Sequence, residues 1–352
     1  MDSDTLEPEA PVGSCFNALR RSARWTSAAM LVLSYAAVTY VVSAQTAPLT
    51  LVSTAWPPFT NPAGQARFAL DLVEAALGRV GLTAKTTIVS PGQFTPSLLN
   101  GKFDGSAAAW KDPERERALI YSQPYLENRL VLVGRYGADV SAKRLSDIQG
   151  KRVAIVEGYS YGYEIELAGP VFVRSSGEED SLARLLKGSV DYTLMDELVV
   201  QYIVSNYPKE SETKLQIGST PLLKRELYFA VRRTRPDAES IIARFNGQLH
   251  DMIVDRTYHR LLHVDWIRAD IDGDGVAEYV PASDKAGPSE PKRSYTLFSN
   301  PEPESQTAPK PGFYVGGNIY SDWASVPESY KEVNPKYPDP RRASASIFKF
   351  TF

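Results

Sequence analysis

The sequence is almost devoid of cysteine: Cys15 is the only one among 352 residues. Cys15 precedes an apolar run, so cleavage after that run would leave a chain with no thiol and no disulfide. A chain of this length buries a core large enough to fold without disulfides, even in an oxidising compartment. The length also favours about two domains.

A net positive charge and recognisable catalytic motifs are missing as well. The formal net charge is −3, so nothing marks a nucleic-acid partner. No nucleophile–base pair, phosphate loop or complete catalytic triad is recognisable. His259 and His263 are four residues apart on an expected helix, but no nearby Glu or Cys completes a metal site, and their apolar neighbours favour packing. These absences favour binding over catalysis.

The N-terminal stretch has the layout of an export signal. Arg20, Arg21 and Arg24 precede an apolar run over residues 25–42, and small residues follow at 43–44. The run is also near the roughly 18-residue length of a membrane-spanning helix. Residues 1–44 are therefore interpreted as a cleaved export signal or, alternatively, as an uncleaved membrane anchor. Both interpretations place the rest of the chain in the periplasm or elsewhere outside the cytoplasm.

Strand-like and helix-like segments alternate from residue 49 to residue 263. Apolar residues recur at helical spacing over 68–80, between strand-like runs at 49–53 and 86–89. The same pattern restarts near residue 145 and passes through a strand at 152–156. This rhythm predicts an α/β fold with parallel strands.

The pattern changes beyond residue 264. Residues 282–352 are rich in Pro and Ser and show little periodicity, which predicts a linker and a poorly ordered tail. Residues 265–281 form an acidic segment with oxygen-bearing side chains at alternating positions and a glycine that permits a tight turn. Such a loop suits Ca²⁺, or else it is a solvated acidic turn. The expected ligands are Asp270, Asp272, Asp274, the carbonyl of Val276, and Glu278; no other cofactor is expected.

Six motifs between residues 49 and 263 resemble the family 3 extracellular solute-binding proteins, which serve amino-acid uptake. They occur in the family's order, at residues 56–59, 68–72, 96–104, 113–125, 145–153 and 188–196. The resemblance implies a two-lobed periplasmic-binding-protein-like fold (type II), whose lobes are joined by two crossing strands near 130–136 and 226–233. Lobe 1 would then comprise 45–135 plus 226–264, and lobe 2 would comprise 136–225.

The resemblance also implies a ligand site in the cleft. Arg115 takes the place of the arginine that binds a carboxylate, as its planar fork allows, or it is a surface arginine. Asp196 takes the place of the acid that pairs with a ligand amino group, or it caps a helix. Ser160 would donate to the ligand, or likewise cap a helix. Trp56, Phe59 and Tyr159 would form aromatic walls, with core packing as the alternative.

Two residues depart from the family pattern. Asp112 and Trp110 stand where the family usually has threonines. Asp112 would partly neutralise Arg115 or cap the turn through Pro113, and the bulk of Trp110 would reshape the pocket. A cationic, aromatic or neutral polar solute therefore competes with a standard α-amino acid.

The resemblance implies a binding protein that delivers a small polar solute to a membrane transporter, such as an ABC transporter. One alternative is an enzyme on the same fold, such as a cyclohexadienyl dehydratase, with Asp112 and Glu114 as candidate acids. The other is a sensory module that passes its closed state to a partner through the tail.

Overall fold

The computed structural model describes residues 47–167, 169–292, 294–296 and 310–333. The expected export signal or anchor, residues 1–44 with Cys15, lies outside the described residues, and so does the chain beyond residue 333. In the part of the chain that the structure describes, no helix is both long and apolar enough to cross a membrane.

Lobe 1 is built on three parallel strands. β1 (Leu49–Thr54) pairs with β2 (Ala84–Val89) and with β3 (Gly105–Ala109). The apolar residues at helical spacing form α2 (Phe68–Arg79), whose buried face joins the core of this lobe. The other elements are α3 (Pro91–Leu99), α4 (Pro113–Ala118), β4 (Leu119–Tyr121), α9 (Ala238–Val254) and α10 (Thr257–Leu262).

Lobe 2 has its own parallel strands. β6 (Arg152–Val156) lies between β7 (Val171–Ser175) and β8 (Tyr192–Asp196) and runs parallel to both. Its helices are η1 (Leu145–Ile148), α5 (Glu164–Leu167), α6 (Glu178–Leu186), α7 (Glu197–Asn206) and α8 (Pro208–Lys214). The α/β class predicted from the sequence is thus confirmed.

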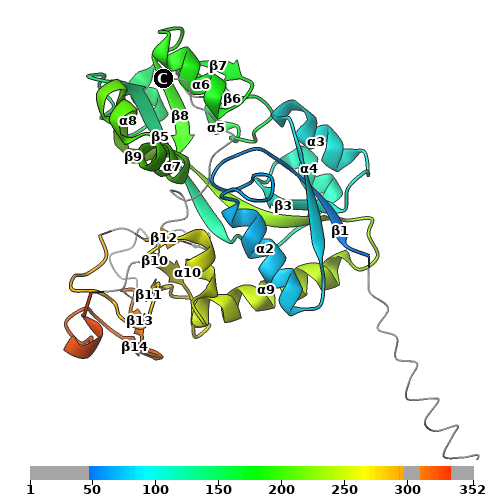
Figure 1. Ribbon diagram of the computed structural model, residues 1–352, viewed down its shortest axis with the longest axis vertical. Helices are drawn as coiled ribbons and strands as arrows, with labels where there is room; N and C mark the ends of the chain where they lie inside the picture. Colours follow the sequence, from blue (N-terminus) through cyan, green and yellow to red (C-terminus); the bar gives the residue numbers. More distant parts are fainter. Residues whose placement is uncertain (1–46, 168, 293, 297–309, 334–352) are drawn as a thin grey trace, which may run out of the picture. The chain divides into compact units, whose positions relative to one another are not determined.

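Two antiparallel strands connect the lobes. β5 (Leu126–Arg135) pairs with β9 (Leu215–Arg232) from Leu126 opposite Leu227 to Arg135 opposite Leu215. The last residues of β9 pair instead with β3 and β4 of lobe 1. Figure 1 shows β5 and β9 running between the two sets of strands. Both segments expected to cross between the lobes fall largely within these two strands, although β9 is far longer than the crossing strand expected near 226–233.

The chain after residue 265 differs from the predicted linker and tail. β10 (Trp266–Ala269), β11 (Glu278–Pro281), β12 (Tyr295–Thr296), β13 (Phe313–Val315) and β14 (Asn318–Tyr320) form a second sheet, followed by η2 (Glu328–Tyr330). We call residues 266–333 the C-terminal β module. Its strands are two to four residues long, too short to produce a visible periodicity.

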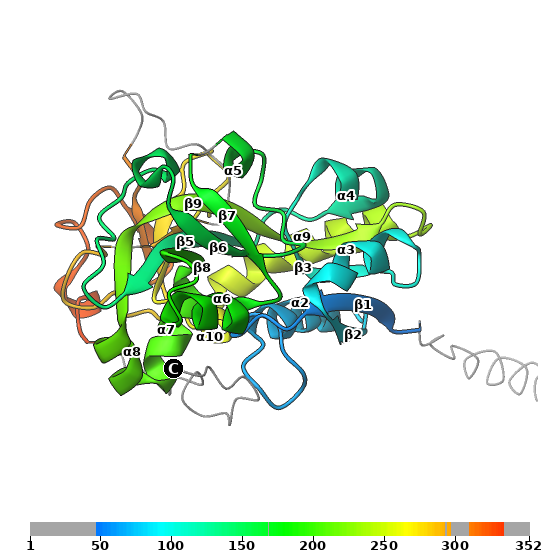
Figure 2. The ribbon, with the colours of Figure 1, turned by 90° about the horizontal axis from the view of Figure 1, so that it is seen from above.

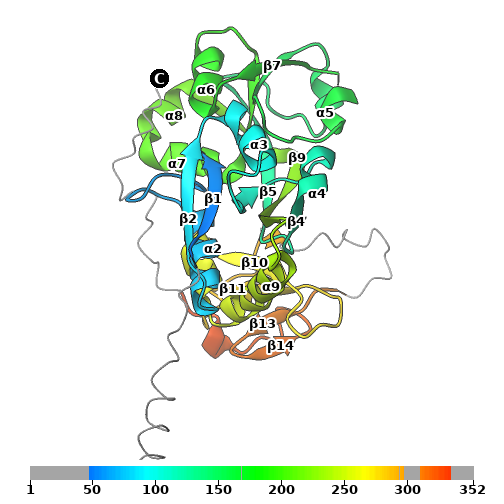
Figure 3. The ribbon, with the colours of Figure 1, turned by 90° about the vertical axis from the view of Figure 1, so that its right-hand side faces the viewer.

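Aromatic side chains supply the core of the C-terminal β module. Phe313 stacks on Tyr279 at 5.1 Å and contacts Trp323 at 5.4 Å between ring centroids. Tyr320, Trp323 and Tyr330 pack partly buried against this core. Figures 2 and 3 show the module, coloured yellow to red, beside α10 and α9.

The module also contacts the crossing strand β5. The guanidinium of Arg129 lies 4.5 Å from the ring centroid of Tyr295 and donates to the carbonyl of Ser294. The hydroxyl of Tyr295 donates to the carboxylate of Glu197, at the start of α7, over 3.4 Å. The module therefore touches both a connecting strand and lobe 2.

Candidate functional site

A small cavity lies where side chains of the two lobes meet. Its volume is about 30 Å³, which leaves room for water but not for a solute. Three parallel strands, β1 and β3 of lobe 1 and β6 of lobe 2, have their carboxyl ends at the cavity. Ligands of α/β sheets bind at the carboxyl ends of strands. The lining residues are Thr54, Trp56, Phe94, Ala108, Ala109, Trp110, Arg115 and Leu227 from lobe 1, and Gly158, Tyr159 and Ser160 from lobe 2.

Arg115 is buried beside this cavity, with 2 % of its surface exposed. Its Nη2 donates to the hydroxyl of Thr95 at 2.7 Å and to the carbonyl of Gly158 at 3.0 Å. Its Nη1 donates to the carbonyl of Trp110 at 3.1 Å, and the guanidinium lies 5.0 Å from the ring centroid of Phe94. Burial lowers the pKa of Arg115, opposed by a nearby carboxylate. The side chain is not the exposed arginine that the sequence left open as an alternative.

Asp112 holds Arg115 from two sides. Its Oδ1 accepts from the backbone N–H of Arg115 at 2.8 Å, which caps the N-terminus of α4. Its Oδ2 lies 3.0 Å from Nε of Arg115 and accepts from the hydroxyl of Ser160 at 2.5 Å. Both roles considered for Asp112, a cap and a partner that neutralises Arg115, occur together.

Hydrogen bonds to Arg115 and Asp112 join the two lobes across the cavity. Ser160 and Gly158 belong to lobe 2, whereas Arg115 and Asp112 belong to lobe 1. Gly158 has φ +77°, and a Cβ atom there would lie 2.7 Å from the carbonyl oxygen of Pro91. Only glycine allows this close approach of the lobe 2 loop to α3.

Aromatic rings fill the space around the cavity. Trp56 contacts Trp110 at 5.5 Å and Tyr159 at 5.7 Å, and Tyr159 contacts Trp110 at 5.6 Å between ring centroids. Tyr161 packs on Trp110 at 5.5 Å. Phe59 does not line the cavity but packs behind Trp56 at 4.3 Å, fully buried in the core. The aromatic wall therefore consists of rings from both lobes.

Lobe 2 buries a carboxyl group near this wall. Asp196 is 1 % exposed; its Oδ1 accepts from the N–H of Leu198 at 2.7 Å and caps α7. Its Oδ2 accepts from Nδ2 of Asn128 at 3.0 Å and from the N–H of Arg129 at 3.1 Å. Asn128 in turn accepts from Nε1 of Trp110 at 2.8 Å, which links Asp196 to the aromatic wall. Burial raises the pKa of Asp196 to about 7, against the opposing effect of these hydrogen bonds.

A second acid, Glu178, lies close to Asp196. It is 7 % exposed at the start of α6, and its Oε2 has no hydrogen-bond partner. Burial, with the charge of Asp196, raises the pKa of Glu178 to about 8. Sequence reasoning missed this residue. The available signal was an acidic residue that follows the strand β7 toward the same sheet edge as Asp196.

Comparisons with known proteins identify the family of most of the chain. Residues 50–268 match the model of the bacterial extracellular solute-binding proteins, family 3. The chain belongs to this family. The ABC transporter arginine-binding protein 1 of Escherichia coli (strain K12) is 23 % identical over 216 residues, which cover 60 % of this chain and 86 % of that protein.

Solved structures of family 3 proteins and related ligand-binding cores share the fold. A mutant of ArgBP from T. maritima has a TM-score of 0.52 and 25 % identity, covering 61 % of this chain and 93 % of that one. The GluR0 ligand-binding core from Nostoc punctiforme, in complex with glutamate, has a TM-score of 0.50 and 20 % identity, covering 61 % and 97 %. The predicted two-lobed periplasmic-binding-protein-like fold is confirmed. Most of the C-terminal β module lies beyond the family match.

The acids on which the enzymatic alternative relied are not free in the cavity of this family 3 protein. Asp112 is engaged by Arg115 and Ser160, and Glu114 is exposed on α4. The histidines also behave as packing residues. His259 bonds through Nε2 to the carbonyl of Val280 at 3.1 Å, and His263 packs on Phe68 at 4.6 Å between ring centroids.

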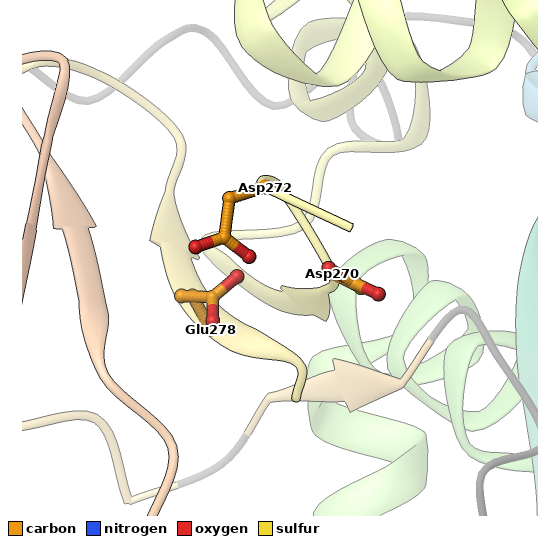
Figure 4. A group of neighbouring side chains, drawn as sticks. All are labelled: Asp270, Asp272 and Glu278. Atoms are coloured by element: carbon orange, nitrogen blue, oxygen red, sulfur yellow. The ribbon is translucent and has the colours of Figure 1, made fainter. Parts of the chain in front are cut away.

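The acidic loop of this protein brings some of its expected calcium ligands together. Carboxylate oxygens of Asp270, Asp272 and Glu278 lie within 4.8 Å of one another, as Figure 4 shows for the side chains. Asp274 is outside this group, and its Oδ1 accepts from the N–H of Val276 at 2.7 Å. The same carboxylates also accept backbone N–H groups of the loop, as a solvated turn would. Calcium binding stays a prediction.

Proposed function

We propose that this protein binds a small polar solute, an amino acid or a related compound, outside the cytoplasm and delivers it to a membrane transporter. The observation that carries the proposal is the interlobe cavity, which has a buried arginine on lobe 1 and a buried acid, Asp196, near its lobe 2 side. An α-amino acid carries one anionic and one cationic group, which complement such a pair of charges. Arg115 would bind the acidic group and Asp196 a cationic nitrogen group of the solute.

The cavity must enlarge before a solute enters. Its volume of about 30 Å³ excludes an amino acid. Opening the lobes would break the hydrogen bonds of Ser160 to Asp112 and of Arg115 to Gly158, and would separate Tyr159 from Trp56 and Trp110. The freed donors of Arg115 and Ser160 then become available to the solute, and β5 and β9 would act as the hinge. Hinge closure around ligands is a known motion of periplasmic binding proteins.

The relatives named for arginine make L-arginine the first solute to test. We expect one or more compounds of a panel of amino acids and related metabolites to raise the melting temperature, because a ligand that binds only the folded state stabilises it. At about 100 times the dissociation constant the stabilisation is about 2.7 kcal/mol, a shift of several degrees.

Chemical analysis of the solute after incubation with the protein distinguishes binding from catalysis. A compound that is recovered unchanged after incubation with the protein supports binding. Its disappearance into a product would identify an enzyme instead, and a complete absence of shifts across the panel would contradict the proposed function.

A separate expectation concerns the acidic loop of the C-terminal β module. We propose that Ca²⁺ binds to Asp270, Asp272 and Glu278, with Asp274 and the carbonyl of Val276 completing the site. Millimolar Ca²⁺ should then raise the melting temperature by a few degrees, and chelation should reverse the shift. Asp272→Asn should abolish the shift, whereas Asp322→Asn, which changes an exposed acid elsewhere in the module, should keep it. Equal melting temperatures with Ca²⁺ and with chelator would refute the site.

A further inference from the structure

Two acids of lobe 2 follow the carboxyl ends of parallel strands in one sheet. Asp196 ends β8, and Glu178 begins α6 three residues after the end of β7. The strand between them, β6, leads into the loop that carries Tyr159 and Ser160, both of which line the cavity. Three neighbouring strand ends therefore direct two carboxyl groups and a cavity wall to the same edge of the sheet.

Glu178 is the group that the protein itself leaves unsatisfied. Asp196 has three hydrogen-bond donors around it, whereas Oε2 of Glu178 is buried without any partner among the described residues. A buried carboxylate without a counter-charge is strongly unfavourable, and a neutral carboxyl without a hydrogen bond is also costly. Such a group is stable in ionised form only when a cation is brought to it.

We infer that Glu178 and Asp196 together form a two-carboxyl subsite for a cationic nitrogen group of the solute, with a guanidinium as the best-fitting class. This inference rests on the proposed function, because it assigns the solute's positive end to lobe 2 and its acidic end to Arg115. A guanidinium presents several N–H donors in one plane and can bridge two carboxylates. Glu178 is then the residue that selects cationic over neutral solutes.

Among the residues that the structure describes, no cationic side chain pairs with Glu178 or Asp196. The titratable and charged groups that interact with the pair or with its tyrosine neighbours are Tyr159 and Tyr161 after β6, Arg174 on β7, Glu197 on α7 and Tyr295 on β12. The hydrogen bond from Arg129 to Asp196 comes from the backbone, and the Arg129 side chain pairs with Glu127 instead. Burial, with the charge of Glu178, raises the pKa of Tyr159, a residue that lines the cavity.

Binding of a cation should therefore release a proton. The pKa of Glu178 is raised to about 8 and that of Asp196 to about 7, so at neutral pH the empty site retains a proton that a cation displaces. Binding should strengthen as the pH rises from about 6 to about 8, because the proton then competes less. A neutral solute would show neither effect.

L-Arginine and L-citrulline provide the test, because they have similar shape and differ in the charge of the terminal group. By calorimetry in buffers of different ionisation enthalpy, we expect wild-type protein to bind arginine at least about 10-fold more tightly than citrulline and to release about one proton per arginine at pH about 7. Glu178→Gln should weaken arginine binding by about 10- to 100-fold, abolish most of the proton release and change citrulline binding by less than about 3-fold.

Glu179→Gln is the matched control, because it removes the same charge from the neighbouring position of α6 and should leave arginine binding within about 2-fold. Circular dichroism and melting curves verify that each variant is folded. The subsite is refuted if a solute binds but Glu178→Gln leaves its affinity and proton release unchanged, or if citrulline binds as tightly as arginine; the proposed function survives either result. If no solute of the panel binds wild-type protein, the proposed function fails, and the subsite fails with it.

Discussion

Replacing Arg115 with alanine is expected to lower solute affinity by at least about 100-fold and the free energy of unfolding by roughly 3–5 kcal/mol. The guanidinium is buried and donates to Thr95, Trp110 and Gly158, so its removal leaves several acceptors and the carboxylate of Asp112 without their partner. Because the donor that Arg115 shares with Gly158 would become available to the solute when the lobes open, affinity and stability should fall together. Isothermal calorimetry and urea unfolding measure the two losses separately.

Two further variants distinguish the hydrogen bonds of the Arg115 guanidinium from the effect of losing a positive charge. Arg115→Lys keeps the positive charge but loses the planar fork, and should recover part of the stability and little of the affinity. Arg117→Ala removes an exposed arginine from the same helix and should change stability by less than about 0.5 kcal/mol. Intact affinity in a folded Arg115→Ala protein would show that the solute does not contact this residue.

Raising the pH from about 6.5 to about 9 is expected to destabilise the solute-free protein by roughly 2–3 kcal/mol. Glu178 has a pKa of about 8 and Asp196 of about 7 in the folded protein, against ordinary values of 4.5 and 3.8. The folded state therefore binds more protons than the unfolded chain in this window, so stability is highest at its acidic end. It is lost as the pH passes through the two folded-state pKa values.

Several other groups with shifted pKa values act mainly below this window. His259 is buried and its pKa is lowered to about 3, so it affects stability only below its ordinary value of 6.5. The lowered pKa values of Asp104, Asp180 and Asp255 matter only at still lower pH.

Urea unfolding along a pH series measures the slope, and Glu178→Gln should remove about half of it or more. Equal slopes in wild type and Glu178→Gln would mean that Glu178 is already ionised in the folded protein.

Much of the fold was predictable from the sequence. Helical spacing of apolar residues over 68–80 predicted α2, and the alternation of segments predicted the α/β class. The length of β9 and the strands of the C-terminal β module were not predictable. β9 exchanges partners between two lobes along its length, and the module's strands are too short for a periodic signal.

Only those residues of the candidate site that belong to recognisable motifs were predictable from the sequence. The motifs indicated five residues that lie around or near one cavity in the structure: Trp56, Trp110, Arg115, Ser160 and Asp196. Their partners were not predictable. Other elements supply Thr95, Asn128 and Glu178. The role of each depends on contacts with residues distant in the sequence, and no local spacing pattern indicates such contacts.

By itself, the sequence determined the α/β class through the alternation of its apolar segments. The two lobes and the place of Arg115 in the cleft were implied by the six motifs that resemble family 3 proteins. Only the tertiary structure decided how that arginine is engaged. Packing places Asp112 and Gly158 on its guanidinium, closes the aromatic rings around a small cavity, and buries Oε2 of Glu178 without a partner. Packing in three dimensions decides which charged groups are buried without partners. A bound solute must pair with these groups, because a buried charge without a partner is unfavourable.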